Sequence, residues 1–416
     1  MRILASIVCG LAVLTAAGET VDGVFDRLDD ALTVGTADGQ LRARLSGLVD
    51  LEGYVFERPA PGLLFTNGGA LFTPRLSLFL DAQLGAKVYV FAQARVDRGF
   101  DPATDPLQAR LDEYAVRLTP GDHPGFNLQV GKFATVVGNW VQRHDSWTNP
   151  FVTAPLPYEN LTGIWDAVAV PASTTLLQWA HVRPQPSANG DESEKYVRLP
   201  IIWGPSYATG LALFGRSGTF EYAAEVKNAA LASRPDAWDV SRIQWQNPTF
   251  SGRLGYRPDT RWNLGLSAST GPYLQPEAQP TIPSGHSRSD YRQTVLGQDL
   301  GFAWHHCQLW TEVYAARFAI PRVGNADTLA YYAEARYKFT PRWFGALRWN
   351  QQFFGRVTDA SGEAVRWGRD LGRLDAAAGC RLSAHTQFKL QFSLQQERGD
   401  TRTVRPTLAG QLTGRF

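Results

Sequence analysis

Apolar and polar residues alternate along most of this chain. In the stretch 41–56, LRARLSGLVDLEGYVF, apolar residues occupy one parity and charged residues the other. The stretches 86–97, 385–397 and 405–416 repeat this two-residue period, and the last residue is the aromatic Phe416. Such a period is typical of a β-strand with one face against an apolar medium and the other against water. Segments of about ten residues are long enough to cross the core of a bilayer at a tilt.

The alternation predicts about eighteen strands, an even number that brings both chain ends to the same side of a membrane. The pattern is weakest in 164–171 and 174–183, and without these two segments about sixteen strands remain. From the N-terminus, the predicted strands are 41–56, 74–83, 86–97, 109–119, 126–133, 164–171, 174–183, 206–215, 219–228, 249–257, 261–270, 295–304, 307–318, 329–339, 342–352, 372–382, 385–397 and 405–416.

The connections between predicted strands are alternately short and long. Transmembrane β-barrels have this asymmetry, because their periplasmic turns are tight and their extracellular loops are long. A soluble β-sandwich, the alternative, does not sort its loops by length between its two ends. The pattern therefore predicts an all-β fold, a transmembrane antiparallel up-and-down β-barrel. The long connections are 57–73, 98–108, 134–163, 184–205, 229–248, 271–294, 319–328 and 353–371.

Aromatic residues support the same prediction. The chain holds 13 Trp, 14 Tyr and 22 Phe, and such residues gather where a barrel wall meets the membrane interface. Several lie next to a predicted short turn or the C-terminus and have the apolar parity of their strand. The predicted periplasmic girdle comprises Trp262, Trp304, Tyr337, Trp343, Phe388 and Phe416.

The N-terminal segment predicts secretion. Residues 1–18 combine Arg2, an apolar run and small residues near Ala17, as in a cleaved signal peptide. An N-terminal core helix is the alternative. Residues 19–40 are then a periplasmic segment, in which 21–32 could form a short amphipathic helix, and 41–416 form the barrel. A secreted barrel of this kind is expected in the outer membrane of a Gram-negative-type bacterium.

The charge and the cysteine content of the chain argue against some other classes of protein. With 41 basic and 39 acidic residues, the chain has no excess of charge that favours nucleic acid. Cys9 lies in the signal segment, so two cysteines remain, Cys307 and Cys380. Both have the outward parity, and the two predicted strands between them place them about 15 Å apart. We expect two free thiols that face lipid.

The inward parity carries many charged residues, which a wet or mutually paired surface tolerates. We predict a water-filled pore with a mild basic excess; structural cross-strand ion pairs are the alternative for each residue. The predicted pore-lining cations are Arg42, Arg44, Arg75, Lys87, Arg95, Arg117, Arg253, Arg336, Lys338, Arg348, Arg373 and Lys389.

The connection 134–163 is the longest and is rich in Trp, Pro and Asn. A long aromatic loop is costly to expose, so we expect it to fold into the barrel and narrow it. An external loop, packed on itself or on a neighbouring subunit, is the alternative. The predicted constriction residues are Arg143, His144, Asp145 and Glu159.

Two motifs suggest other chemistry. The sequence RHDS at 143–146 contains Ser, His and Asp, but a catalytic triad needs residues that the fold brings together. His305 and His306 are adjacent, so their side chains point apart, and no further metal ligand is evident. We therefore expect no catalytic residue, no metal and no cofactor.

Two features resemble known families. Bacterial outer-membrane barrels end on Phe or Trp after alternating apolar residues, as Leu408, Leu412 and Phe416 do here. That resemblance implies recognition of the last strand by the barrel assembly machinery. The segments LQVGKFATVVGNW and LGQDLGFAWHHCQLWTEVYAARF resemble the phosphate-selective porin O/P type, through Gly131-Lys132-Phe133, Asp299-Leu300 and Glu312. This second resemblance implies a trimeric, sixteen-stranded channel.

The sequence thus predicts a porin for passive diffusion of small hydrophilic solutes, with a mild preference for anions. The expected partners are membrane lipids, the assembly machinery, small solutes and two further copies in a homotrimer, with no nucleic acid. An exporter of an anionic polysaccharide is an alternative that suits the arginines of the lumen. A barrel enzyme acting on lipids or peptides is a further alternative.

Overall fold

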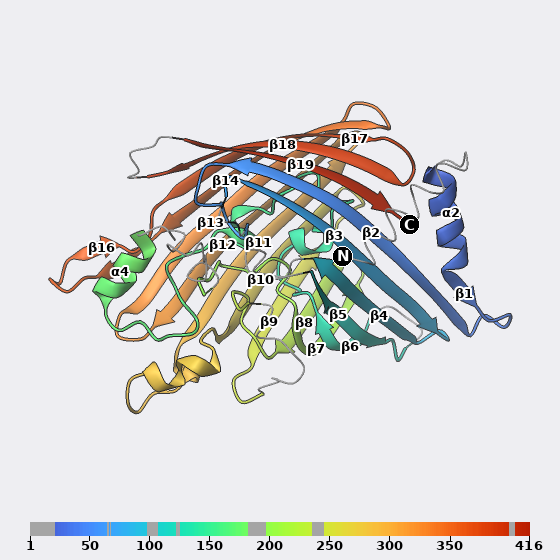
Figure 1. The fold of residues 1–416 in the computed structure, drawn as a ribbon. Coiled ribbons are helices and arrows are strands. Elements are labelled where there is room, and N and C mark those ends of the chain that lie inside the picture. The colour runs from blue at the N-terminus through green and yellow to red at the C-terminus, as the bar shows by residue number, and fades with distance from the viewer. Residues whose placement is uncertain are drawn as a thin grey trace.

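The computed structural model describes residues 21–64, 66, 68–97, 107–121, 125–181, 197–234, 245–398 and 404–416. The predicted signal peptide, Cys9 included, lies outside these residues. Within them, one sheet holds seventeen strands, of which β1 (Thr33–Gly35) pairs only with β2. The other sixteen pair antiparallel in chain order and form a closed barrel, because the last strand pairs with β2 (Figure 1).

The barrel strands range in length from 7 residues in β6 to 16 residues in β2. Their bounds are β2 (Leu41–Phe56), β3 (Ala70–Leu84), β4 (Val88–Asp97), β5 (Gln108–Leu118), β6 (Asn127–Phe133), β7 (Ala208–Ser217), β8 (Phe220–Lys227), β9 (Thr249–Tyr256), β10 (Trp262–Pro272), β11 (Arg292–Trp304), β12 (Cys307–Ile320), β13 (Gly324–Lys338), β14 (Trp343–Phe354), β17 (Leu371–Arg381), β18 (Thr386–Glu397) and β19 (Arg405–Arg415).

The strand number of eighteen was wrong, and sixteen is correct. The segments 164–171 and 174–183 are not barrel strands: the first is irregular, and the second contains helix α4 (Ser173–His181). Ile164, Val170 and Leu176 are buried in an apolar cluster of the long β6–β7 connection. Their apolar spacing reflects packing inside a folded loop, which can imitate the alternation of a strand.

The predicted long connection 319–328 was also wrong. Strand β12 ends at Ile320 and β13 begins at Gly324, so a tight turn joins them. Phe318 remains paired in the sheet at this end and packs edge-on against Tyr273, with ring centroids 5.4 Å apart. Other external connections hold short elements: β15 (Arg356–Thr358), β16 (Ala364–Arg366) and the 3₁₀ turns η4 (Pro276–Thr281) and η5 (Arg288–Asp290).

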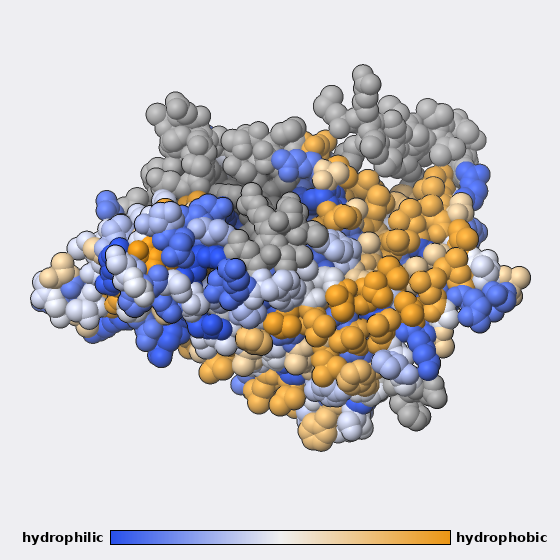
Figure 2. Space-filling model, turned by 90° about the horizontal axis from the view of Figure 1, so that it is seen from below, coloured by the Kyte–Doolittle hydropathy of each residue, from blue (hydrophilic) through white to orange (hydrophobic). Residues whose placement is uncertain are grey.

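The outward face of the wall is apolar and exposed. Leu254 and Leu266 on neighbouring strands are 68% and 63% exposed, as expected of side chains that meet lipid rather than a protein core. Figure 2 shows a broad hydrophobic area with hydrophilic residues at either end of the molecule. In the described part of the chain, no helix has the length and apolar character needed to cross a membrane.

The predicted aromatic girdle lies on this outward face next to the short turns. Its exposed members are Trp262, Trp304, Tyr337, Trp343 and Phe388. Phe416 also has outward parity, but its ring is half-buried because Phe25 stacks on it with centroids 6.3 Å apart. Phe25 belongs to helix α2 (Val21–Ala31), which lies outside the barrel near the C-terminus (Figure 1).

Both cysteines occupy the outward parity of the wall. Cys307 pairs with Tyr337, and Cys380 pairs with Trp343, two girdle residues. Strands β13 and β14 separate their own strands, and both thiols are free. The expectation of two free thiols is therefore confirmed.

Candidate functional site

The first part of the connection between β6 and β7, residues 134–163, lies inside the barrel. It contains a 3₁₀ turn, η1 (Trp140–Arg143), and a short helix, α3 (Leu156–Glu159). Inward side chains of the wall bind its backbone. Glu312 of β12 accepts hydrogen bonds from the N–H groups of Asn139 and Trp140, and from the Tyr158 hydroxyl at 2.7 Å. We call residues 134–163 the constriction loop.

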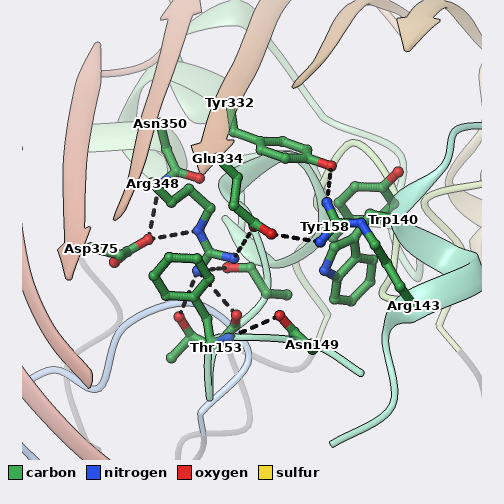
Figure 3. A network of polar contacts seen from close by, with 12 residues as sticks. Trp140, Arg143, Asn149, Thr153, Tyr158, Tyr332, Glu334, Arg348, Asn350 and Asp375 are labelled. Atoms are coloured by element: carbon green, nitrogen blue, oxygen red, sulfur yellow. Dashed lines mark hydrogen bonds and ion pairs between the residues drawn. The ribbon is translucent and has the colours of Figure 1, made fainter. Parts of the chain in front are cut away.

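An ion-pair network holds the middle of this loop against β13, β14 and β17 (Figure 3). Arg143 donates to Glu334 at 2.6 Å and to the Tyr332 hydroxyl at 2.9 Å. Arg348 lies between Asp375, at 2.8 Å, and Glu334, at 3.5 Å. Each buried charge has an opposite charge beside it, which offsets the cost of removing it from water.

Arg348 also binds the loop itself. Its Nη2 donates to the carbonyl oxygen of Thr153 at 3.0 Å (Figure 3). The guanidinium lies over the ring of Phe151, with 4.2 Å between Cζ and the ring centroid. The network therefore joins wall to loop as well as strand to strand.

Strand β18 fixes the following part of the loop. The ammonium group of Lys389 donates to three loop carbonyl oxygens, those of Ser146 at 2.7 Å, Asn149 at 2.9 Å and Phe151 at 3.3 Å. Two residues along the strand, the Gln391 side chain accepts the N–H of Val152 at 2.7 Å. Backbone groups that would otherwise be buried without partners are thus satisfied by the wall.

The four predicted constriction residues divide into two pairs. Arg143 and Glu159 are buried and attach the loop to the wall, since Glu159 pairs with Arg373. His144 and Asp145 instead line a cavity on the periplasmic side of the loop. His144 Nε2 lies 2.8 Å from the Tyr207 hydroxyl, and burial lowers the pKa of its imidazole.

The predicted pore-lining cations also fall into groups. Arg348, Arg373 and Lys389 face inward, but the loop covers them and they are almost completely buried. A second group pairs with carboxylates, which lie on the wall for Arg75 (with Asp50 and Glu52), Arg95 (with Asp112) and Arg253 (with Asp299), and on helix α2 for Arg44 (with Asp29). Lys87 lies in the β3–β4 turn, where it donates to the Pro120 carbonyl.

Asp112 was not among the predicted site residues. A bulge in β5 shifts the register between Gln93 and Ala94 of β4, so that Asp112 and Glu113 both lie on the inward side. Asp112 receives Arg95 and Arg110, at 2.9 Å each. A two-residue period assigns adjacent residues to opposite faces of a strand. The inward position of both Asp112 and Glu113 could therefore be predicted only by knowing where the bulge lies.

Four of the predicted cations have no carboxylate within ion-pair distance among the described residues. They are Arg42, Arg117, Arg336 and Lys338. The Nε atom of Arg336 is buried and has no hydrogen-bond partner among the described residues. Lys338 lies close enough to Arg336 and Arg381 to be repelled by both. These side chains, together with Arg381 and Arg415, gather toward the periplasmic ends of their strands.

Two adjoining cavities lie between the loop and the wall formed by β2–β9. The larger has a volume of about 770 Å³ and reaches from Gln93 and Arg117 to His144 and Trp147 of the loop. The smaller, about 380 Å³, extends from Arg117 toward Arg253. The loop therefore leaves open space on its periplasmic side.

The alternative motifs do not form reactive sites. His144 contacts the Val141 carbonyl and Tyr207 rather than Ser146, and Asp145 accepts N–H groups of its own turn. His305 packs against Trp304, and His306 packs against Tyr337. No group of three metal-ligating side chains occurs among the described residues.

Comparisons with known proteins agree on the architecture. OmpF of Salmonella typhi, in complex with daunomycin, aligns with a TM-score of 0.57 at 9% identity, over 92% of this chain and 100% of that chain. The chain has the porin fold. The outer membrane channel DcaP of Acinetobacter baumannii matches with a TM-score of 0.54 at 8% identity, over 92% and 99% of the two chains.

An anion-selective porin from Comamonas acidovorans also matches, with a TM-score of 0.53 at 10% identity, over 90% of this chain and 100% of that chain. No family model matches the sequence, and no curated protein is similar to it at the sequence level. At these sequence identities the likeness establishes the porin fold alone. The solute depends on the side chains that line the lumen.

Proposed function

We propose that this protein is an outer-membrane porin through which small hydrophilic solutes diffuse passively, with a mild preference for anions. The observation that carries the proposal is the unequal pairing of charges in the lumen. Cations beneath or beside the constriction loop have carboxylate or carbonyl partners, whereas Arg42, Arg117, Arg336 and Lys338 have no carboxylate partner among the described residues. Unpaired cations leave a positive potential in the periplasmic half of the lumen, which attracts anions.

Reversal potentials test this preference. The purified protein is inserted in a planar bilayer with a tenfold KCl gradient, and the zero-current potential is expected to have the sign of the chloride equilibrium potential. Arg336→Gln with Lys338→Gln should move it toward zero. Arg317→Gln is the matched control, because Arg317 lies outside the lumen, exposed and paired with Asp327 at 2.7 Å. Cation selectivity of the unmodified protein would contradict the proposal.

Phosphate preference is the finer form of the proposal, suggested by the resemblance to the O/P type. The residues of that resemblance have other contacts here: Lys132 donates to the Leu111 carbonyl, Asp299 binds Arg253, and Glu312 holds the constriction loop. Phosphate preference therefore depends on the unpaired cations. Replacing chloride with phosphate on one side should increase anion selectivity if the finer proposal holds, and should leave it unchanged or lower if only charge matters.

Assembly into a homotrimer belongs to the proposal as well. The outward residues of β4 are Val88, Val90, Ala92, Ala94 and Val96, and those of β2 are similarly small or aliphatic. A smooth aliphatic wall suits close packing between copies, while the aromatic wall of β10–β14 suits lipid. Ala92→Arg is expected to reduce the mass measured by light scattering in detergent to that of one chain.

The C-terminal strand supports recognition by the barrel assembly machinery. The outward parity of β19, continued to the last residue of the chain, includes Leu408, Leu412 and Phe416. Phe416→Ala should lower the amount of folded protein in the outer membrane. An unchanged amount would argue against this signal.

A further inference from the structure

We propose that Arg117, with the aromatic side chains around it, forms a binding site for an organic carboxylate that has a flat apolar body, such as an aromatic acid. The inference rests on the proposed porin function, for which it names a solute class. Four features of the periplasmic lumen carry it: an aromatic wall, a preorganised guanidinium, a cavity of suitable size and the pairing of the nearby acids.

The aromatic wall lies on the inward parity of β4 and β7, where a water-filled pore ordinarily has polar side chains. Tyr89 and Phe91 are stacked with ring centroids 6.0 Å apart. The Arg117 Cζ atom lies 5.4 Å from the Tyr89 centroid, 5.8 Å from that of Phe91 and 4.9 Å from that of Phe214. Three rings thus surround one guanidinium, and they offer a flat surface to a planar solute.

The guanidinium is held in place but is not neutralised. Its Nε and Nη2 donate to Gln129 Oε1 at 3.2 and 3.0 Å, and no carboxylate lies within ion-pair distance in the described part of the chain. A guanidinium has five N–H donors in a planar fork that matches a carboxylate. The donors that Gln129 does not take remain available to a carboxylate ligand.

The space beside Arg117 fits such a ligand. Arg117 and Gln129 line both the cavity of about 770 Å³ and the cavity of about 380 Å³. Phe79 and Phe91 line the larger one, opposite Gln142 and Trp147 of the constriction loop. Volumes of this order are ordinary for small-molecule sites.

The acidic residues that border the larger cavity are engaged elsewhere. Glu113 accepts the N–H of Ala134 at 2.7 Å, and Asp145 accepts the N–H groups of Trp147 and Thr148. Asp29 pairs with Arg44 at 2.7 Å. The negative charge of these acids is therefore partly compensated, whereas the positive charge of Arg117 has no carboxylate within ion-pair distance among the described residues.

A ligand-observed NMR titration of the detergent-solubilised protein tests the site with three probes: benzoate, acetate and benzyl alcohol. Benzoate is expected to bind about fivefold more tightly than acetate, because acetate lacks the ring. It should also bind about tenfold more tightly than benzyl alcohol, which lacks the charge. Equal affinity for benzoate and either analogue would overturn the proposal.

Variants locate the binding. Arg117→Gln should weaken benzoate binding about tenfold, and Phe91→Leu should weaken it about fivefold. Arg317→Gln is the matched control: Arg317 lies outside the lumen, exposed and paired with Asp327 at 2.7 Å, and its replacement should leave the affinity unchanged. Circular dichroism first verifies the barrel in each variant. If Arg117→Gln does not fold, the comparison of Phe91→Leu with Arg317→Gln still decides the outcome.

The two proposals can fail separately. A protein that conducts anions but binds benzoate no better than acetate would contradict the aromatic-carboxylate site alone. A protein that binds benzoate at Arg117 but conducts no ions would contradict the porin function alone.

Discussion

The ammonium group of Lys389 lies 2.7 Å from the carbonyl oxygen of Ser146, and Lys389 is completely buried. A wall cation thus donates hydrogen bonds to carbonyl oxygens of the constriction loop instead of facing a solute. The contact is one of several that attach the constriction loop to the inner wall of the barrel.

Lys389→Met should loosen the loop and increase single-channel conductance. Methionine fills similar space but leaves the carbonyl groups of Ser146, Asn149 and Phe151 without this donor. A buried unsatisfied polar group costs about 1–3 kcal/mol. Lys338→Met is the matched control, since Lys338 has no such contacts and should change selectivity without faster hydrogen exchange in 146–154. Equal exchange in the two variants would count against the attachment.

Arg143→Ala should act through the position of the loop rather than through lost pore charge. Arg143 is buried between Glu334 and Tyr332, so its removal leaves the buried Glu334 carboxylate with the more distant Arg348, at 3.5 Å, as its ion-pair partner. Breaking a buried pair from one side typically costs about 3–5 kcal/mol. We expect a lower melting temperature and noisier single-channel currents. A change in ion selectivity with unchanged stability would contradict this role.

The packing of His144 should weaken in mild acid. Burial lowers the folded-state pKa of His144 below its ordinary value of 6.5. Below that ordinary value the unfolded chain binds the proton first, so stability falls as the pH decreases; above it, this group has no effect. Protease sensitivity of the loop should therefore increase between about pH 6.5 and 5. His144→Gln should remove that pH dependence, and its persistence would exclude His144 as the cause.

Helix α2 should stabilise the seam where β19 meets β2. The Phe25 ring is 5% exposed and lies parallel to the Phe416 ring, with an angle of 6° between them. Phe25→Ala should lower stability by about 3 kcal/mol without altering conductance. Leu28→Ala is the control, because Leu28 lies on the same helix with 39% of its surface exposed. Equal melting temperatures for the two variants would argue against the seam contact.

Gly131→Ala should destabilise the start of the constriction loop. Gly131 has a φ of 144°, and a Cβ there would lie 2.1 Å from the Tyr114 carbonyl oxygen. We expect a loss of about 1–3 kcal/mol and a lower yield of folded barrel. Gly53→Ala should be tolerated, since a Cβ at that site has open space around it. Tolerance of both variants would show that the backbone here adapts easily.

The barrel wall could be predicted from sequence because lipid and water lie on opposite sides of every strand. Sixteen of the predicted strands overlap the observed ones, and Trp262, Trp304 and Trp343 lie on the outward face as expected. The β6–β7 connection could not be predicted in the same way. Its apolar residues, such as Ile164 and Leu176, are buried in one apolar cluster, and that packing has no fixed period.

For the candidate site, the sequence could predict only which face of the barrel wall each residue lies on. Parity correctly assigns Arg348 and Arg117 to the lumen, but it does not show which of them the loop covers. Arg348 is covered because Asp375, 27 residues away, and Thr153, 195 residues away, converge on it. Arg117 is uncovered because the loop passes on the far side of a cavity. Such differences depend on long-range register and loop path, which local patterns do not contain.

Liposome swelling tests the central claim most directly: that the barrel encloses a passage for small solutes which favours anions. The purified protein is reconstituted into liposomes, and swelling is followed in iso-osmotic solutions of matched neutral and anionic solutes. We predict swelling well above that of protein-free liposomes, and faster for the anion. Rates equal to the protein-free background for every solute would contradict the claim.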